Sequence, residues 1–199
     1  MRRTAEDKAE TRQRIVRTAG RMFRGHGLAE TGVAEVMAEA GLTHGGFYRH
    51  FASKEDLAAA AIEAAFAEMR GQLQSAAAAA PPGRVLETVI DLYLTEAHRD
   101  RPDRGCVMAA LGMEAPRAGG AMQEAYRRGI ADLLTIYTGL IEAPTKRQAE
   151  DRAQALLAQL VGGLLVARAL TDPAESKRAL QTARRAALAA AGTEKDRSL

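Results

Sequence analysis

The sequence is poor in cysteine, in aromatic residues and in long apolar runs. Its 199 residues include a single cysteine, Cys106, no tryptophan, and 4% aromatic residues in total. One cysteine excludes an intrachain disulfide and any cysteine-rich zinc module, and it fits a reducing compartment. The longest apolar run late in the chain, Leu160–Ala167, is far shorter than the roughly 20 residues that cross a membrane.

A secretion signal is also missing from the start of the chain. The basic residues Arg2 and Arg3 are followed by the polar stretch Thr4–Lys8, where a signal peptide needs apolar residues. These absences together predict a soluble protein of the cytoplasm.

The apolar residues that are present favour helices. They make up 47% of the chain and are mostly Ala, Leu, Val and Met, which prefer helices to sheets. They recur at helical spacing, and no segment alternates with period two. We therefore expect an all-α fold of roughly nine helices and exclude a β-sandwich or β-barrel. The expected helices cover residues 7–24, 33–40, a short segment after Thr43, 53–73, 86–98, 106–114, 121–140, 145–170 and 173–191.

Three of these helices begin at capping sequences. Ser53 is followed three residues later by Asp56, and Thr145 by Gln148, which is the spacing of a capping box. Asp172-Pro173 places an N-cap residue before a proline at the first helical position. Clusters of glycine and proline predict helix ends at residues 25–27, at 41 and at 81–83.

Positive charge is concentrated at the start of the chain. Residues 1–54 contain ten basic and six acidic residues, whereas the whole chain has 28 basic and 25 acidic residues. Three of the four histidines, His26, His44 and His50, also lie in this segment. A basic head on a nearly neutral body suggests a polyanionic partner, although a basic helix is often only a solvated face.

Residues 33–51 have the spacing of a helix-turn-helix. A short helix with the apolar residues Val36 and Met37 ends at Gly41, and Thr43 is expected to cap a second short helix. In this motif the N-terminal residues of the second helix face base edges in the major groove. Those residues here are Thr43, His44, Gly45 and Gly46.

Contacts with DNA phosphates are expected a little further along the chain. Tyr48, His50 and Lys54 offer a phenol, an imidazole and an ammonium group. The backbone N–H groups at the start of the helix after Ser53 are also expected to be free to bind a phosphate.

The segment Thr43–Leu57, THGGFYRHFASKEDL, closely resembles the signature of TetR/AcrR-type regulators. The resemblance covers about residues 10–57. It implies a DNA-binding helix-turn-helix domain at 1–57, a helical body at 58–192 that binds a ligand and dimerises, and a polar tail at 193–199. Arg104–Leu111 also looks like a Gly-Cys segment found in one subset of the family.

The resemblance assigns roles in DNA binding to individual residues. Phe47 and Phe51 match positions that pack the head, and Thr31 matches a threonine near the start of the first motif helix. Gly32 departs from the residue types common at its position, which puts the first turn of that helix in doubt. The implied DNA-binding residues are Thr31, Thr43, His44, Gly45, Gly46, Phe47, Tyr48, His50 and Lys54.

The resemblance also implies a ligand pocket and a dimer interface in the body. The dimer would form through the last two long helices of each chain, where small residues share one face and suit close packing in a four-helix contact. The expected interface residues are Ala155, Gln159, Gly162, Gly163 and Val166. The expected ligand-binding residues are His98, Cys106, Met108, Met113, Tyr126, Tyr137 and Arg168.

Several of these residues have simpler interpretations. Tyr126 and Tyr137 fit ordinary core positions, and Arg168 fits a side chain that reaches the surface. Cys106 follows Arg104 near an expected helix start, which favours a reactive thiolate, yet a single cysteine is commonly an inert buried thiol.

The chain is not expected to be an enzyme or to hold a cofactor. Cys106 with His98 as its base would need an orienting group and an oxyanion hole, and neither is visible. No Gly-rich phosphate loop or paired-carboxylate motif is present. The head histidines lack a pair at i, i+4, so no metal is expected.

The sequence therefore predicts a homodimeric transcriptional regulator that binds operator DNA. We expect a repressor that a small-molecule effector releases from its operator. The alternative is a repressor switched by modification of Cys106. A helical dimer that acts only through protein contacts would not need the base-facing residues Thr43, His44 and Gly45.

Overall fold

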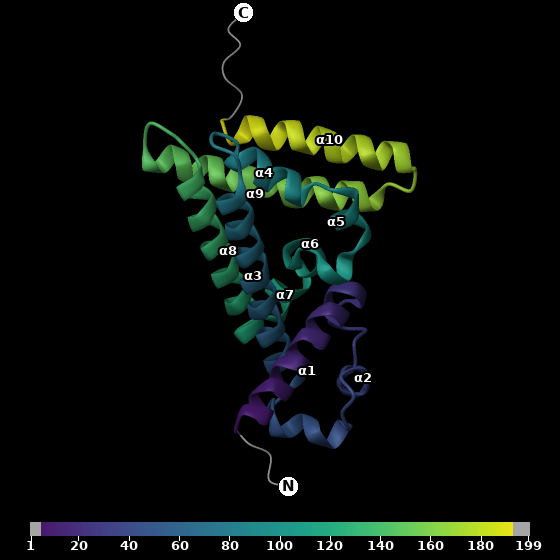
Figure 1. Cartoon of the computed structure of the whole chain (residues 1–199). Helices are drawn as coiled ribbons and strands as arrows, with labels where there is room; N and C mark the ends of the chain where they lie inside the picture. Colours follow the sequence, from purple (N-terminus) through teal and green to yellow (C-terminus); the bar gives the residue numbers. More distant parts are fainter. Residues whose placement is uncertain (1–4, 193–199) are drawn as a thin grey trace, which may run out of the picture. The chain divides into compact units, whose positions relative to one another are not determined.

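The computed structural model describes residues 5–192, and over this range the chain forms helices and no β-strand (Figure 1). The prediction of an all-α fold is confirmed, and the described residues form ten α-helices and two short 3-10 helices. They are α1 (Ala5–His26), α2 (Val33–Glu39), η1 (His44–Arg49), α3 (Lys54–Ala79), α4 (Val85–Tyr93), α5 (Glu96–Asp100), η2 (Pro102–Arg104), α6 (Val107–Leu111), α7 (Glu114–Ala118), α8 (Gly120–Leu140), α9 (Lys146–Ala169) and α10 (Pro173–Ala190). The predicted polar tail, 193–199, lies outside the described residues.

The chain divides into two compact units. One combines the chain up to Ala67 with Pro102–Gly129, and the other combines Glu68–Arg101 with the chain from Ile130 onward. The long helices α3 and α8 each contribute to both units. The predicted functional division at residue 57 stays a prediction.

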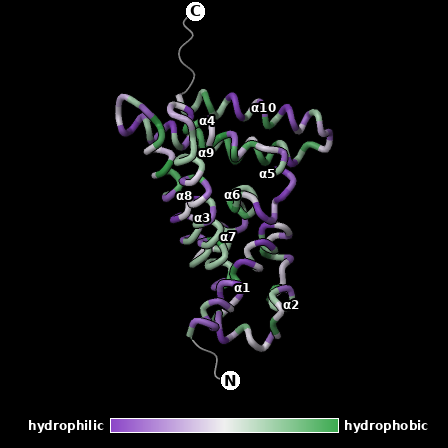
Figure 2. The backbone as a smooth tube through the Cα atoms, in the orientation of Figure 1, coloured by the Kyte–Doolittle hydropathy of each residue, from purple (hydrophilic) through white to green (hydrophobic). Residues whose placement is uncertain are grey.

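In the first unit, α1 and α2 each bury one face in the core. In α1, Ile15, Ala19 and Phe23 are fully buried, and α2 contributes Val36 and Met37. Hydrophobic and hydrophilic residues alternate along these helices in short groups (Figure 2), which is the pattern of helices with one buried face. In the part of the chain that is described, no helix is both long and apolar enough to cross a lipid bilayer.

The end of α1 is fastened to the segment 102–129 of the same unit. The buried Arg24 donates through Nε to the carbonyl of Asp103 at 3.0 Å. The N–H of Leu28 donates to Oε2 of Glu114 at 2.8 Å. Gly27 has φ +89°, and a Cβ there would come within 3.2 Å of the same carboxylate. Glycine therefore serves two needs at this turn, a left-handed backbone and room for Glu114.

In the second unit, α9 and α10 pack closely together. A Cβ on Gly163 would collide with Cβ of Ala183, so glycine allows the two helices to approach. Asp172 caps α10 by accepting the N–H groups of Ala174 and Glu175 at 2.8 and 2.9 Å. Thr145 also caps its helix, since its hydroxyl accepts the N–H of Gln148 at 3.2 Å. Both predicted helix starts are confirmed.

Arginine side chains join α4 to α10 on the surface of the second unit. Arg184 donates to the carboxylates of Asp91 and Glu87. Arg84 also donates to Glu87, at 2.8 Å. Hydrogen bonds from Arg84 and Arg184 lower the pKa of Glu87.

Two of the predicted helices are divided in the structure. The expected helix 86–98 is interrupted at Leu94, because Thr95 caps a new helix by accepting the N–H of His98 at 3.0 Å. The expected helix 106–114 becomes α6 and α7, and Pro116 lies inside α7. A proline is tolerated there because first-turn N–H groups have no partner within the helix. The helix after Ser53 runs beyond residue 73 to Ala79, since alanine is the best helix former.

Candidate nucleic-acid interface

The turn between α2 and η1 has the geometry expected of a helix-turn-helix. Gly41 adopts φ +69°, the left-handed conformation that glycine adopts most readily. The N–H of Leu42 donates back to the carbonyl of Met37 at 2.8 Å, and that of Gly41 to Ala38 at 2.9 Å. These two bonds close the end of α2 and direct the chain into η1.

The second helix of the motif is a 3-10 helix, His44–Arg49. Thr43 stands at its N-cap position in an extended conformation, but its side chain makes no capping hydrogen bond, so the predicted cap is wrong in that respect. Gly45 and Gly46 are poor α-helix formers, which fits the tighter and shorter helix. The first turn is closed by the N–H of Gly46, which donates to the carbonyl of Thr43 at 3.0 Å.

The predicted DNA-binding residues divide into an exposed and a buried group. Tyr48 is 69% exposed, and Thr43, His44 and Gly45 are also exposed, whereas Gly46 and His50 are half-buried.

Phe47 and Thr31 are each 1% exposed, so neither is available to touch DNA directly. Phe47 packs the head, as the signature implies, and the hydroxyl of Thr31 donates to the carbonyl of Gly27 at 2.8 Å. This corrects the prediction that both belong to the DNA-binding set.

The start of α3 is already occupied by its own side chains. Ser53 Oγ accepts the N–H of Asp56 at 3.2 Å, and Asp56 Oδ2 accepts the N–H of Ala52 at 3.1 Å. A hydrogen bond from its own backbone lowers the pKa of Glu55. These bonds occupy part of the helix start, and phosphate binding by its remaining N–H groups stays a prediction. Lys54 also has a partner within the chain, the carbonyl of Ala29 at 3.4 Å.

A continuous row of rings links the exposed end of η1 to α1. The ring of His44 lies 6.3 Å from Tyr48, Tyr48 lies 5.2 Å from Phe47, and Phe47 stacks on Phe51 at 5.7 Å. At the end of this row the guanidinium of Arg12 lies over the Phe51 ring, 4.7 Å from its centre. Arg12 is not among the residues predicted for the site, since nothing in the sequence pairs it with Phe51.

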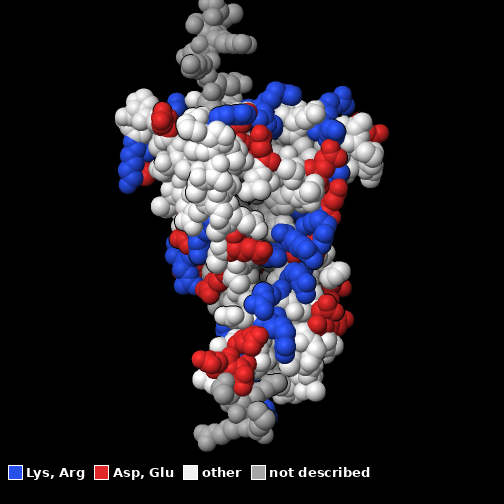
Figure 3. All heavy atoms as spheres, viewed as in Figure 1, with Lys and Arg blue, Asp and Glu red and all other residues white. Residues whose placement is uncertain are grey.

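Arg49 was also left out of the predicted site, although it is exposed on η1. Other exposed arginines, Arg14, Arg17 and Arg21, lie on the outer face of α1, away from its buried residues. Figure 3 shows basic side chains over α1 and acidic ones at its N-terminal end. The charge of the head is thus spread over more than one face.

The predicted ligand-binding residues do not form one cluster. Cys106, Met108 and Tyr126 are buried together in the first unit, and the hydroxyl of Tyr126 lies 3.4 Å from the carbonyl of Met108. Burial raises the pKa of Tyr126. Met113 is 64% exposed, which corrects its assignment to the lining of an internal pocket.

The remaining three, His98, Tyr137 and Arg168, belong to the second unit. Arg168 donates to the carbonyls of Arg99 and His98 at 3.1 and 2.9 Å. Its guanidinium therefore satisfies two carbonyl groups in the last turn of α5. Nδ1 of His98 lies 2.7 Å from the carbonyl of Tyr93, and burial lowers the pKa of His98. Tyr137 is buried.

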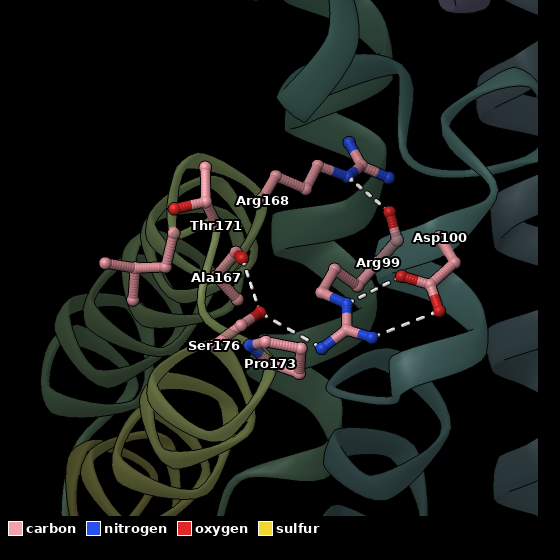
Figure 4. Close-up of a pocket in the computed structure, with 8 residues that line it drawn as sticks. Arg99, Asp100, Ala167, Arg168, Thr171, Pro173 and Ser176 are labelled. Atoms are coloured by element: carbon pink, nitrogen blue, oxygen red, sulfur yellow. Dashed lines mark hydrogen bonds and ion pairs between the residues drawn. The ribbon is translucent and has the colours of Figure 1, made fainter.

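Arg168 also lines an open pocket of about 260 Å³ at the corner between α9 and α10 (Figure 4). Its other lining residues are Arg99, Asp100, Ala167, Leu170, Thr171, Pro173 and Ser176. Arg99 donates to Asp100 at 2.6 and 3.1 Å and to Ser176 at 3.0 Å, and Ser176 donates to the carbonyl of Ala167 at 2.6 Å. These bonds hold α5 against α9 and α10, so the pocket is lined by structural contacts.

Four of the five predicted interface residues lie on an accessible face of α9. Ala155, Gln159 and Val166 are exposed, and a Cβ on Gly162 would meet open space. Gly163 instead faces Ala183 of the same chain, which corrects its assignment to the interface.

The features described here define a helix-turn-helix DNA-binding regulator. They are a two-helix turn closed at a left-handed glycine, a basic head, and the exposed N-terminal end of η1, here called the reading end. Residues 15–61 match the family described as bacterial regulatory proteins, tetR family. The repressor BepR of Brucella suis is 29% identical over 180 residues, which is 83% of each chain. The regulator TtgR of Pseudomonas putida is 40% identical over 63 residues, 32% of this chain and 30% of that protein.

Solved structures agree with these relatives. A TetR regulator from Chloroflexus aurantiacus is 26% identical with a TM-score of 0.76, over 96% of this chain and 98% of that one. The reduced form of NemR from E. coli, at 20% identity and a TM-score of 0.74 over 89% and 95% of the two chains, shares the fold. Residues 15–61 thus match the tetR family of regulatory proteins, and over most of its length the chain is similar to a solved TetR regulator. Membership of the Gly-Cys subset stays a prediction.

Proposed function

We propose that this regulator is a homodimeric repressor that binds a palindromic or pseudo-palindromic operator in the cytoplasm and leaves it when a small molecule binds the body. The observation that carries the proposal is the exposed end of η1, with Thr43, His44, Gly45 and Tyr48. In helix-turn-helix dimers the two reading helices meet half-sites one helical turn, about 34 Å, or a multiple of it apart. A relative named as a repressor, BepR, supports repression.

Gly45 adds an independent argument for close approach to DNA. A Cβ at this position would meet nothing of the chain within 4 Å, and its φ is not in the left-handed region. Neither packing nor backbone conformation therefore requires glycine there. An incoming DNA backbone or base edge explains why a residue without a side chain stands at the reading end.

The dimer would form through the exposed face of α9 together with α10. Val166 is 54% and Leu165 45% exposed, and small residues at Ala155 and Gly162 let a second helix approach. Large apolar side chains that remain exposed on one helix face favour burial in a contact with another chain.

The segment 102–129 offers a route from the body to the head. It carries the buried Cys106, Met108 and Tyr126, and its Asp103 and Glu114 hold the end of α1. A ligand that moves this segment would move α1 and change the spacing of the two reading helices. Such a ligand acts only if its affinity differs between the two states.

Burial favours the small-molecule mechanism over the thiol switch. Cys106 is 1% exposed, whereas a sensing thiol must meet its oxidant or electrophile. The chain holds no second cysteine to resolve a sulfenic acid. Cys106→Ser separates the two mechanisms, because it should abolish an oxidant response and leave a small-molecule response in place.

The test is fluorescence anisotropy on DNA from the protein's own upstream region, or on a site selected from random sequences, against scrambled DNA over a salt series. We expect tight binding to the specific DNA and weaker, steeply salt-dependent binding to the control. Tyr48→Ala should weaken binding while the helical content stays unchanged. Equal and weak binding to selected and scrambled DNA would refute the proposal.

A further inference from the structure

Arg12 is an exposed cation whose position is fixed by an aromatic ring. Its guanidinium lies 4.7 Å from the centre of the Phe51 ring, and Phe51 is itself 2% exposed. No carboxylate among residues 5–192 forms an ion pair with Arg12. A guanidinium that stacks on a ring keeps its N–H donors at the edge, ordered and available for a planar or phosphate acceptor.

The ring under Arg12 belongs to the row that begins at the reading end of η1. Three successive contacts, at 5.2, 5.7 and 4.7 Å, connect Tyr48 to Arg12 through Phe47 and Phe51. Since Tyr48 lies at the exposed end of η1, these packed rings place the guanidinium on the same part of the head as the proposed DNA contact. Arg12 is therefore placed to reach the phosphates that border the groove.

The other groups at this corner of the head have partners within the chain. The amides of Ala52 and Asp56 are capped by Asp56 and Ser53, and Lys54 donates to the carbonyl of Ala29. Phosphates carry the largest share of non-specific DNA affinity, and arginine is the side chain best suited to them. The guanidinium of Arg12 thus adds a charged donor at a corner where several other donors are already occupied.

We propose that Arg12 contacts the DNA backbone and that the Phe51 ring holds it in position for this contact. The inference rests on the DNA binding proposed for η1, and it extends the interface from the helix-turn-helix onto α1. Because a phosphate contact carries no sequence information, Arg12 contributes to affinity and register and not to the choice of bases.

The test compares Arg12→Gln with Arg17→Gln, which removes a charge that is also exposed, from the outer face of α1. Anisotropy titrations over a salt series give the slope of log K against log salt for selected and for scrambled DNA. Arg12→Gln should reduce the magnitude of the slope by about 1 and weaken binding several-fold and about equally on both DNAs. Arg17→Gln should leave the slope unchanged.

Two further results separate a DNA contact from a structural role. Arg12→Lys keeps the charge and should restore most of the slope, while melting temperatures of all three variants should stay close to that of the wild type. An Arg12→Gln protein with an unchanged slope, or one whose loss matches that of Arg17→Gln, overturns the inference. The salt slope on scrambled DNA tests the Arg12 contact even if the protein binds no specific operator. A failure of the proposed function would instead appear as equal binding to selected and scrambled DNA.

Discussion

At the scale of single residues, the interior of the head contains buried polar groups that stabilise the connections around the helix-turn-helix. Thr31 is the clearest case, since its side chain is buried and its hydroxyl donates to Gly27 at 2.8 Å. The same glycine makes room for Glu114. Thr31 therefore stabilises the α1–α2 connection, and its buried hydroxyl is not available for contact with bases.

Thr31→Val should destabilise the protein by about 1–2 kcal/mol, because it removes a buried hydrogen-bond donor without a large change in volume. Urea unfolding followed by circular dichroism measures the effect. Thr31→Ser keeps the hydroxyl and should cost less. Equal stability of the valine variant and the wild type would contradict the structural role.

Cys106 should react slowly with a thiol reagent in the native protein, because its side chain is 1% exposed, and rapidly in denaturant. The release of chromophore from a disulfide reagent measures both rates, and Cys106→Ser is the blank. Complete labelling of the native protein within seconds would instead support the thiol-switch alternative.

His98 should make stability depend on pH below about 6.5. Burial lowers its pKa in the folded state, so the unfolded chain takes up a proton at a higher pH than the native one. Stability is then fully present above the unfolded pKa and declines as pH falls toward the lowered folded pKa. Between pH 7 and pH 5, His98→Gln should show a smaller loss of stability in urea than the wild type. Parallel curves would rule out this contribution.

At the scale of elements, the close contact of α9 and α10 depends on a missing side chain. A Cβ on Gly163 would collide with Ala183, whereas a Cβ on Gly71 of α3 would meet nothing within 4 Å. Both glycines lie inside long helices of the second unit. The pair therefore separates packing from helix propensity.

Gly163→Ala should destabilise the protein by about 1–3 kcal/mol through overpacking. Part of this loss is offset because alanine has a higher helix propensity than glycine. Gly71→Ala should stabilise it by up to about 1 kcal/mol, since alanine is the better helix former. Thermal and urea unfolding of both variants test the contrast. A stabilised Gly163→Ala protein would show that α9 and α10 separate at no cost.

At the scale of the whole molecule, the proposed dimer places the α9 face with Ala155, Gly162 and Val166 between two chains. Val166→Glu should convert the dimer to monomers, because a carboxylate next to its symmetry mate is buried without a partner. Sedimentation velocity measures the change, and operator affinity should fall with it. Gln72→Glu, at an exposed position of α3 in the same unit, is the matched control and should remain dimeric. A Val166→Glu protein that stays dimeric would move the interface elsewhere.

The amino-acid sequence by itself determined the all-α class, the helix-turn-helix and most helix starts. Helical spacing of apolar residues and local caps such as Asp172 and Thr145 depend on neighbours within one or two turns. They can therefore be recognised from the amino-acid sequence alone. The signature from Thr43 to Leu57 identified the family for the same reason.

Only the tertiary structure decided which of those residues are available. It buried Thr31 and Phe47, exposed Met113, turned Gly163 toward α10 and set Arg12 over Phe51. Each of these outcomes depends on a partner that is distant in the sequence and close in space. Burial and contact arise from packing between helices, and local patterns of residue type carry too little information to specify that packing.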